Sequence, residues 1–393
     1  LKRAGLSLEQ VDRLAFYEKP LPKFDRILVG YMASPFRSYR AFLKAMPVWL
    51  KRKLWIEHTL RKELGYEGEI CYVPHHLSHA AGAFFCSPFD EAATLTIDGV
   101  GEWATASFGV AEKNSVRLLN EMAYPHSVGL LYSAFTHYLG FRVNSSEYKI
   151  MGLAPYGTPR FADLIEQELV TIHPDGSIHL HLRNFEFHRS LQMTGRAFER
   201  LFGRPRRDPE SALDDFHADV AASVQRVTEK IVLTMAAHVR KVTNRKHLCF
   251  SGGVALNCTA NGLLHQSKLF DDIYIQPASG DAGGAVGAAL YTHYCLTGDA
   301  KRSQPFFNLG PTFSDDDMRR CLENASVPYQ QVTPEQRAER VAEALDAGAI
   351  VALYQGPMEF GPRALGFRSI LGDPRQPDMK ARINAAVKYR EPF

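Results

Sequence analysis

The chain reads HHLSHAAGAFF at 75–85 and, after a short gap, TLTIDGVGEWATASFGV at 94–110. His75 and His79 stand four residues apart in a segment with a helical pattern, so both imidazoles lie on one helix face, one turn apart. Asp98 ends an apolar, β-type run. Two imidazoles and a strand-end carboxylate make a three-ligand site that leaves positions open for a substrate oxygen. The pattern predicts metal-assisted chemistry, with a pair of surface histidines as the alternative for a His-x-x-x-His motif taken alone.

The composition is that of an ordinary globular protein, with 45% hydrophobic and 23% charged residues. A length of 393 residues is sufficient for two or three domains, each with its own core. The net charge of +3 is too small to indicate a nucleic-acid partner. The six cysteines include no C-x-x-C pair, which suits reduced thiols, and no apolar run reaches membrane-spanning length. We therefore expect a cytoplasmic protein with neither a membrane nor a nucleic-acid partner.

The second half of the chain alternates between helices and strands. Residues 212–242 carry apolar side chains at intervals of three and four, the stripe of a long amphipathic helix. Two apolar strands follow, at 247–250 and 273–277, and a glycine-rich turn and a helix come after each of them. Together with the strands expected at 94–98 and 104–110, this order predicts an α/β fold.

Both glycine-rich turns carry residue types that suit a phosphate. Backbone N–H groups at the start of a helix bind anions, and glycine leaves them accessible. Tight packing between strand and helix is the alternative use of glycine, but two such turns in succession favour nucleotide binding. Asp281, in the second turn, is a candidate fourth metal ligand. The candidate phosphate-binding residues are Ser251, Gly252, Gly253 and Asn257 in the first turn, and Gly280 and Gly283 in the second.

A new unit is expected from residue 336, after a polar connector at 299–335. It contains a helix, a strand at 349–355 and the loop GPMEFGPRALGFRSILGDPR at 356–375. Arginine side chains suit phosphate and carboxylate oxygens, and a loop held by internal salt bridges is the alternative. The arginines crowded in this loop are Arg363, Arg368 and Arg375.

Several long motifs together resemble one family, the ATP-dependent O-carbamoyltransferases of nodulation-factor and antibiotic biosynthesis. The motifs extend over nearly the whole chain: HHLSHAAGAFF, TIDGVGEWATASFG, LYSAFTHYLGF, EYKIMGLAPYG, SGGVALN, GDAGGAVGAAL, MEFGPRALGFRSILGDPR and MKARINAAVKYREPF. The resemblance implies a duplicated actin/sugar-kinase-like (ASKHA) metal domain at 1–298, then the connector, and then the start of a threonylcarbamoyl-AMP-synthase-like α/β domain at 336–393.

The resemblance also implies a reaction. In the family, ATP and carbamoyl phosphate form carbamoyl-adenylate in the C-terminal domain. The metal domain then passes the carbamoyl group to a hydroxyl of a small-molecule acceptor, such as a sugar, an aminoglycoside or a related natural product. The expected metal is a divalent ion, iron in the first place, with zinc or manganese as alternatives. By motif match its ligands are His75, His79, Asp98 and Asp281.

Further residues receive expected roles in this scheme. Arg363 and Lys388 match the positions that bind carbamoyl phosphate or ATP. A base must activate the acceptor hydroxyl, and three residues are suitable by type: Lys149, Glu147 and His126. Lys149 and Glu147 lie in a polar loop, where they could instead pair with each other.

The chain departs from the family at both ends. We expect its opening strands to be absent, since residues 1–16 have the pattern of an amphipathic helix, and we expect the adenylate-forming domain to stop after its first elements. We therefore expect the chain by itself to bind metal and nucleotide without completing the transfer; a homodimer is left open. Two rival functions are a tRNA threonylcarbamoyl transferase and a non-catalytic nucleotide-binding relative. The fused C-terminal motif argues against the first, and the intact ligand set against the second.

Overall fold

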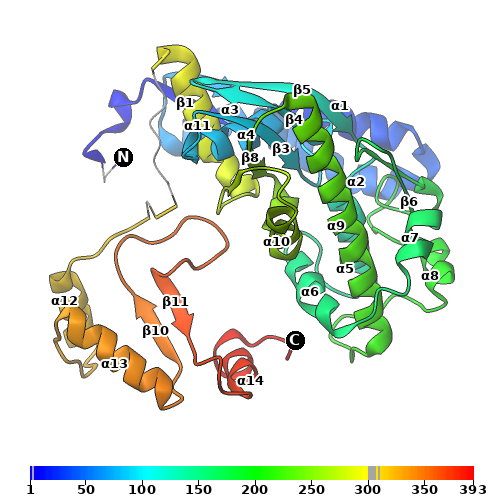
Figure 1. Cartoon of the computed structure of the whole chain (residues 1–393). Coiled ribbons are helices and arrows are strands. Elements are labelled where there is room, and N and C mark those ends of the chain that lie inside the picture. The colour runs from blue at the N-terminus through cyan, green and yellow to red at the C-terminus, as the bar shows by residue number, and fades with distance from the viewer. Residues whose placement is uncertain (2–3, 300–306, 309) are drawn as a thin grey trace. The chain divides into compact units, whose positions relative to one another are not determined.

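The chain divides into two compact units, Leu1–Pro305 and Phe306–Phe393, which are coloured from blue to yellow and from yellow-orange to red in Figure 1. The computed structural model describes residue 1 and residues 4–299, 307–308 and 310–393. Part of the predicted connector, at 300–306 and 309, lies outside the described residues. The predicted domain boundaries stay a prediction.

A mixed five-stranded sheet is the centre of the first unit. Its order is β5-β4-β3-β8-β9, with β3 antiparallel to β4 and parallel to β8. In the register of β3 with β8, Thr96 pairs with Ser251, so the carboxyl ends of these two strands meet at one edge of the sheet. The segments that follow them therefore start side by side. The strands are β3 (Glu91–Ile97), β4 (Ala104–Glu112), β5 (Ser115–Ala123), β8 (His247–Ser251) and β9 (Asp272–Ile275).

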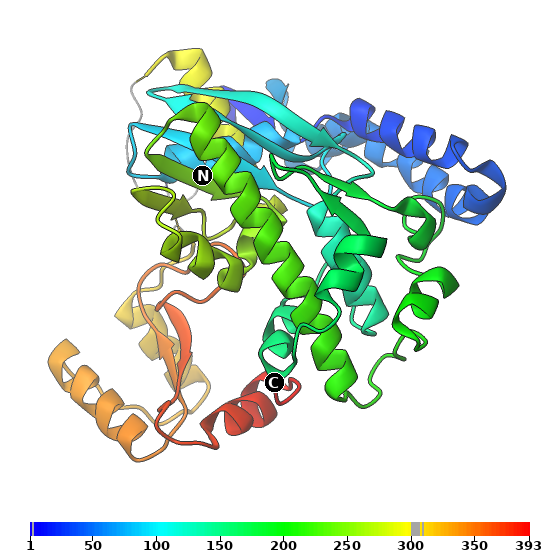
Figure 2. The same ribbon diagram turned by 45° about the vertical axis from the view of Figure 1, so that its right-hand side comes forward.

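Helices cover both faces of this sheet (Figure 2). α4 (His75–Cys86) is buried along nearly its whole length, and its Phe84 belongs to the same core cluster as Ala92 of β3. α9 (Asp215–Thr243) lies on the other face, where its side chains line a small cavity together with Leu95. Positions 92 and 95 point to opposite faces because side chains alternate along a strand. The long helix predicted at 212–242 is thus confirmed as a core element.

A two-stranded parallel sheet precedes α4. It consists of β1 (Arg13–Phe16) and β2 (Glu69–Tyr72), and α1 (Pro20–Met32), α2 (Pro35–Lys51) and α3 (Ile56–Leu64) lie between them in the chain. The helix predicted over 1–16 is wrong, because the segment contains a short 3-10 turn followed by β1. Its strand partner lies far away in the sequence, and local periodicity does not report such a partner.

The remaining elements of the first unit connect and flank these layers. They are α5 (Val128–Tyr138), α6 (Glu147–Leu153), α7 (Ala162–Glu168), β6 (Val170–Ile172), β7 (Ile178–Leu180), α8 (Arg196–Phe202), α10 (Cys258–Gln266) and α11 (Asp281–Thr297). A mixed α/β fold with a central multi-stranded sheet is therefore confirmed. The duplicated actin-like architecture stays a prediction, because the β1–β2 sheet has two strands within the described ranges.

The second unit is smaller. Two helices lead into an antiparallel strand pair, and a short helix and a π-turn follow. One loop was predicted over 356–375, whereas a strand occupies 368–371. The elements are α12 (Asp315–Asn324), α13 (Pro334–Asp346), β10 (Val351–Tyr354), β11 (Arg368–Leu371), α14 (Met379–Ile383) and the π-turn Asn384–Lys388. Across both units, no helix in the described ranges is long and apolar enough to cross a membrane.

α4 and α11 pack against each other at glycines. At Gly287 a Cβ atom would lie 1.8 Å from the carbonyl oxygen of Ser78, and at Gly82 it would lie 3.3 Å from the Cα atom of Gly287. The helices can lie this close only because these positions have no side chain. Since α4 carries His75 and α11 starts at Asp281, this contact sets the distance between the two.

We predict that Gly287→Ala pushes α4 and α11 apart. The added methyl group has no room, and overpacking of a core contact costs about 1–3 kcal/mol of unfolding free energy. The variant should unfold at a lower temperature and bind less than one divalent ion per chain, measured by calorimetry and by metal analysis after loading with Zn²⁺. Gly262→Ala in α10 is the matched control, because nothing lies within 4 Å of its Cβ position. Equal unfolding temperatures and metal contents for the two variants would contradict the prediction.

Candidate metal centre

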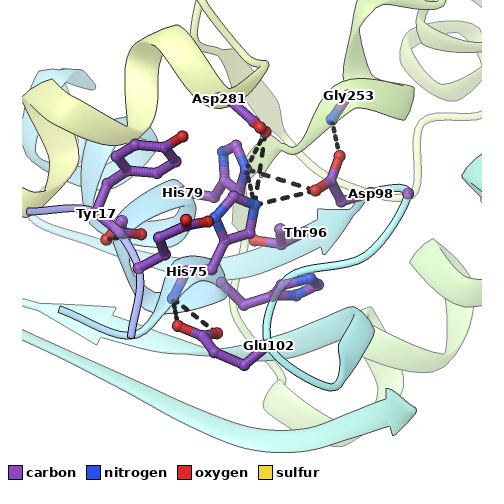
Figure 3. A network of polar contacts seen from close by, with 12 residues as sticks. Tyr17, His75, His79, Thr96, Asp98, Glu102, Gly253 and Asp281 are labelled. Carbon is purple, nitrogen blue, oxygen red and sulfur yellow. Dashed lines mark hydrogen bonds and ion pairs between the residues drawn. The ribbon is translucent and has the colours of Figure 1, made fainter. Parts of the chain in front are cut away.

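Four donor side chains converge at one edge of the central sheet (Figure 3). His75, His79, Asp98 and Asp281 each offer one ligand atom, and these atoms all lie within 4.8 Å of one another. The Nε2 atom of His75 lies 3.1 Å from Asp98 Oδ2, 3.1 Å from His79 Nε2 and 3.6 Å from Asp281 Oδ1. The Nε2 atom of His79 lies 3.9 Å from Asp98 Oδ2 and 3.8 Å from Asp281 Oδ1. The fold thus brings together the four side chains that the sequence selected.

Three elements deliver these donors. His75 is the first residue of α4 and His79 lies one turn later, Asp98 directly follows β3, and Asp281 is the first residue of α11. The two histidines and Asp98 are buried, whereas the side chain of Asp281 is 58% exposed. The cluster is therefore closed toward the sheet and open on the side of Asp281, where a substrate can approach.

Both carboxylate oxygens of Asp98 are held in place. Oδ2 faces His75, and Oδ1 accepts a hydrogen bond of 3.0 Å from the backbone N–H of Gly253. Burial alone would raise the pKa of Asp98, but the hydrogen bond from His75 and the nearby imidazoles hold it well below its usual range. Burial alone would lower the pKa of His75, but Asp98 and Asp281 together raise it above its usual value. Asp98 is thus an anion at neutral pH, the form in which a carboxylate binds a metal ion.

The donor set fits a divalent metal ion. Two imidazole nitrogens with two carboxylate oxygens suit Fe²⁺, Zn²⁺ and Mn²⁺, and no cysteine is among the four. The Nε2 atoms of His75 and His79 face each other at 3.1 Å, an arrangement that a shared cation explains because both can then act as lone-pair donors. That a divalent ion binds here stays a prediction, and so does the identity of the ion.

The histidine between the two candidate ligands belongs to the core. Nδ1 of His76 lies 2.9 Å from the hydroxyl oxygen of Ser107. Burial lowers the pKa of His76 to about 3. His76 is therefore neutral at physiological pH and packs beneath the cluster.

Glu102 was not predicted from the sequence, yet its carboxylate binds the first backbone N–H of α4, the helix that contains both histidines. Its carboxylate accepts the backbone N–H of Lys19 at 2.7 Å, and both of its oxygens lie 3.1 Å from the backbone nitrogen of His75. Glu102 and Asp98 lie in the same connection between β3 and β4. This connection therefore contacts both the backbone N–H and the imidazole of His75 (Figure 3). The sequence signal was weak, an acidic residue within TIDGVGEW.

We predict that Glu102→Ala weakens metal binding about tenfold, because the support of a ligating histidine typically contributes tenfold to a hundredfold in affinity. Competition between the protein and a fluorescent Zn²⁺ chelator measures the change. Glu102→Asp should recover part of the loss because it keeps a carboxylate, and Glu67→Ala, at an exposed position, should change nothing. An unaltered affinity in Glu102→Ala would show that Glu102 does not position His75.

The first glycine-rich turn supports Asp98. The hydroxyl groups of Ser251 and Thr96 are hydrogen-bonded at 3.0 Å, and the N–H of Gly253 is donated to Asp98. Gly252 has a φ of +89°, and a Cβ there would lie 2.3 Å from the last carbonyl oxygen of β3. These three predicted phosphate-binding residues therefore form a wall of the metal cluster. Whether they also contact a nucleotide stays a prediction.

The other predicted phosphate-binding residues also have structural contacts. Asn257 caps α10 by accepting the N–H of Ala260 at 3.1 Å, and it exchanges two hydrogen bonds with the side chain of Gln225. Gly280 directly precedes α11. Gly283 is buried, and a Cβ there would lie 1.9 Å from a carbonyl oxygen. Close packing, the alternative use of glycine, thus describes Gly283, and its contact with phosphate stays a prediction.

Two of the three candidate bases lie in α6, and the third, His126, precedes α5. Glu147 is the first residue of α6 and accepts hydrogen bonds from a serine hydroxyl at 3.0 Å and a backbone N–H at 2.8 Å. The ammonium group of Lys149 lies 5.5 Å from the ring centre of Phe141. His126 accepts the N–H of Leu180 through Nδ1, and burial lowers its pKa. Both His126 and Glu147 thus have hydrogen-bond partners, which does not decide between the candidates. Glu147 and Lys149 stay the predicted bases.

In the second unit a carboxylate fixes the arginine loop. Glu359 accepts the backbone N–H groups of Leu365, Phe367 and Arg368 at 2.8, 2.7 and 3.1 Å. Burial alone would raise the pKa of Glu359, but these N–H groups lower it to about 2. The loop thus has a defined shape around an ionised glutamate.

The charged residues of this unit differ in their surroundings. The guanidinium of Arg368 lies 3.5 Å from the ring centre of Tyr354 and donates to loop carbonyl oxygens. Arg375 forms ion pairs with two aspartates at 2.6 and 2.8 Å. Arg363 and Lys388 are exposed. Internal contacts thus account for Arg368 and Arg375. The exposure of Arg363 and Lys388 leaves a ligand able to reach them.

Comparison with known proteins identifies the family. The family described as carbamoyltransferase N-terminus matches residues 1–290, and the one described as carbamoyltransferase C-terminus matches residues 342–393. The chain therefore belongs to the carbamoyltransferase family. The resemblance predicted from the motifs is confirmed.

Three curated relatives show the extent of the similarity. The uncharacterized protein sll1178 of Synechocystis is 47% identical over 408 residues, covering 100% of this chain and 66% of its own. The nodulation protein NolNO of Sinorhizobium fredii is 37% identical, covering 100% and 55%. The nodulation protein NolO of Bradyrhizobium diazoefficiens is 38% identical, covering 81% and 56%. The chain thus spans between 55% and 66% of the length of these relatives.

Among solved structures, HypF of T. kodakarensis aligns with 63% of this chain and 39% of its own. The sequence identity is 16% and the TM-score 0.35. Values this low carry no argument about fold or function.

We predict that His79→Ala lowers the affinity for a divalent ion by about one hundredfold or more, because removing a ligand costs more than removing its support. Chelator competition with Zn²⁺ or Fe²⁺ measures the affinity, and anomalous scattering at the metal edge locates the ion in a crystal of the unaltered protein. His265→Ala, at an exposed position of α10, is the control. A metal peak bonded to neither His75 nor His79, or an unchanged affinity in His79→Ala, would reject the site.

Proposed function

We propose that this chain carries the transfer site of an O-carbamoyltransferase. The carbamoyl group would pass from carbamoyl phosphate, through carbamoyl-adenylate made with ATP, to a hydroxyl of a sugar or a related natural product. The observation that carries the proposal is the convergence of His75, His79, Asp98 and Asp281 at an open edge of the sheet. Membership of the carbamoyltransferase family supports the transferred group, and the nodulation-protein relatives support a small-molecule acceptor.

The chemistry explains why a nucleotide is proposed. Hydrolysis of carbamoyl phosphate by one water molecule would give carbamate and inorganic phosphate. Carbamate is a poor electrophile because its carbon bears an anionic oxygen. If that oxygen attacks the α-phosphorus of ATP, pyrophosphate leaves and carbamoyl-adenylate remains. The acceptor hydroxyl then attacks the carbamoyl carbon, its proton passes to a base, and the C–O bond to AMP breaks. The products are the carbamate ester and AMP.

Each candidate residue has a definite part in this scheme. The four-residue cluster would hold a divalent cation, which when bound would polarise the carbamoyl carbonyl and neutralise phosphate oxygens. Glu102 and Gly253 keep His75 and Asp98 in place for that purpose. The exposed side of Asp281 is the proposed entry for the acceptor. Glu147 or Lys149 would take the proton of the acceptor hydroxyl.

Adenylate formation is proposed for the second unit. Arg363 is exposed on a loop whose backbone is fixed by Glu359, so its guanidinium can be presented to an anion with little ordering cost. Lys388 is a second exposed cation in the same unit. Both would contact the oxygens of carbamoyl phosphate or ATP.

We predict that Arg363→Ala in the full-length protein slows adenylate formation by on the order of one hundredfold, the usual effect of losing one strong donor to a developing charge. The measurement is carbamoyl-phosphate-dependent release of pyrophosphate from ATP, together with the metal content, which should not change. Arg320→Ala, at an exposed position of α12, is the control.

His79→Ala supplies the reciprocal test. It should slow the release of AMP in the presence of a sugar acceptor and leave pyrophosphate release intact. Normal pyrophosphate release in Arg363→Ala would remove the role of this arginine. Absence of any AMP release by the unaltered full-length protein with ATP, carbamoyl phosphate and a panel of amino-sugars would overturn the proposed function.

A further inference from the structure

α2 exposes a continuous apolar stripe. Its members are spaced by three, four and seven residues, so they lie along one side of the helix. Phe36, at the start of the helix, is 99% exposed and stands clear of the rest of the unit. The other members are more than half exposed: Tyr39, Leu43 and Leu50.

A basic stripe runs beside the apolar one. Four of its cations, Arg37, Arg40, Lys44 and Lys51, each follow an apolar member by one residue in the sequence, which places them about 100° further round the helix. Residues 35–53 contain six cations, all exposed, and no carboxylate. Asp25 of α1 and Glu57 of α3 are the exposed carboxylates of the neighbouring helices nearest in sequence. The six cations are Arg37, Arg40, Lys44, Lys51, Arg52 and Lys53.

The third side of α2 is anchored in the unit. Its buried residues are Ser38, Ala41, Met46 and Trp49. The hydroxyl of Ser38 donates to the carbonyl oxygen of Tyr31 at 2.7 Å, and the rings of Trp49 and Phe24 lie 5.8 Å apart. Because this side is fixed against α1, the apolar and basic stripes face outward together. In Figure 2 these two helices are the blue pair at the edge of the first unit.

We propose that this face of α2 docks on an anionic lipid bilayer. An exposed row of aromatic and aliphatic side chains beside a row of lysine and arginine is the pattern of a helix that lies in the membrane interface. Each cation near an anionic surface adds attraction, and six without a carboxylate among them give a strong preference for anionic lipid. A helix of this kind lies on the bilayer without spanning it. The expectation that the chain has no membrane partner rested on the absence of a spanning segment, and this docking, which is independent of the proposed reaction, revises it.

Other occupants fit the face less well. A second copy of the chain would bring six cations against six cations. An acidic protein would satisfy the charges, but it would need a preformed pocket for a phenyl ring that protrudes as fully as that of Phe36. Lipid chains need no such pocket.

The test is sedimentation of the full-length protein with vesicles. We expect binding to phosphatidylcholine vesicles that contain about 30% phosphatidylserine, little binding to phosphatidylcholine alone, and weakening as the salt concentration rises. The triple variant Arg37→Glu/Arg40→Glu/Lys44→Glu should lower the affinity about tenfold or more. The double variant Phe36→Ser/Leu43→Ser should lower it at every salt concentration, because it removes the apolar contribution.

Matched controls separate the face from the overall charge. The triple variant Arg117→Glu/Arg226→Glu/Lys241→Glu makes the same change of charge on other exposed positions. Leu191→Ser/Val242→Ser removes two exposed apolar side chains elsewhere. Both controls should bind vesicles like the unaltered protein. All variants should keep the unaltered unfolding temperature.

Four results would overturn the proposal. The first is no vesicle binding at low salt, and the second is equal loss in the variants and their controls. The third is a dimer, seen by light scattering, that Phe36→Ser/Leu43→Ser dissociates, because the face would then belong to a second copy. The fourth is binding to polyglutamate that matches binding to the anionic vesicles, which would assign the face to an acidic protein.

Discussion

The first unit depends on the close packing of α4 against α11, in which the backbones of the two helices touch at glycines. Gly82 and Gly287 let the two helices approach until the carbonyl oxygen of Ser78 fills the space of a missing methyl group. That oxygen belongs to the residue before His79, so core packing and ligand position are set by the same atoms. The approach places the first residues of both helices around one point. Core and site here cannot be altered independently.

The second support of the site is the pairing of β3 with β8. It brings the connection after β3 against the first glycine-rich turn, where one N–H fixes Asp98. The buried carboxylate stays ionised because the hydrogen bond from His75 and the nearby imidazoles outweigh its loss of hydration. A carboxylate held ionised in this way is costly unless a cation is shared with it. The electrostatics of the cluster and the metal proposal are therefore consistent with each other.

Local patterns were sufficient for much of the fold and the donor set. The spacing of His75 and His79 places both on one helix face, and the end of an apolar run places Asp98 at the end of a strand. The apolar stripe of α9 likewise predicts its helix and its buried side. β1 was missed because a strand partner distant in sequence leaves no local signal. The glycine turns show a deeper limit. Phosphate binding and close packing both require an absent side chain, so sequence alone could not tell that Gly283 packs or that the N–H of Gly253 is used by Asp98.

The long separation of the site's two halves in the chain affects how the protein folds. The hydrogen bond between Thr96 and Ser251 closes a loop of 155 residues. Folding must offset the entropy lost in closing that loop before Asp281 can join Asp98 and the histidines. The isolated α4 segment offers two imidazoles only, a weak chelate. An ion that binds the complete set would therefore recognise the finished fold alone, and its binding would draw the folding equilibrium toward that state.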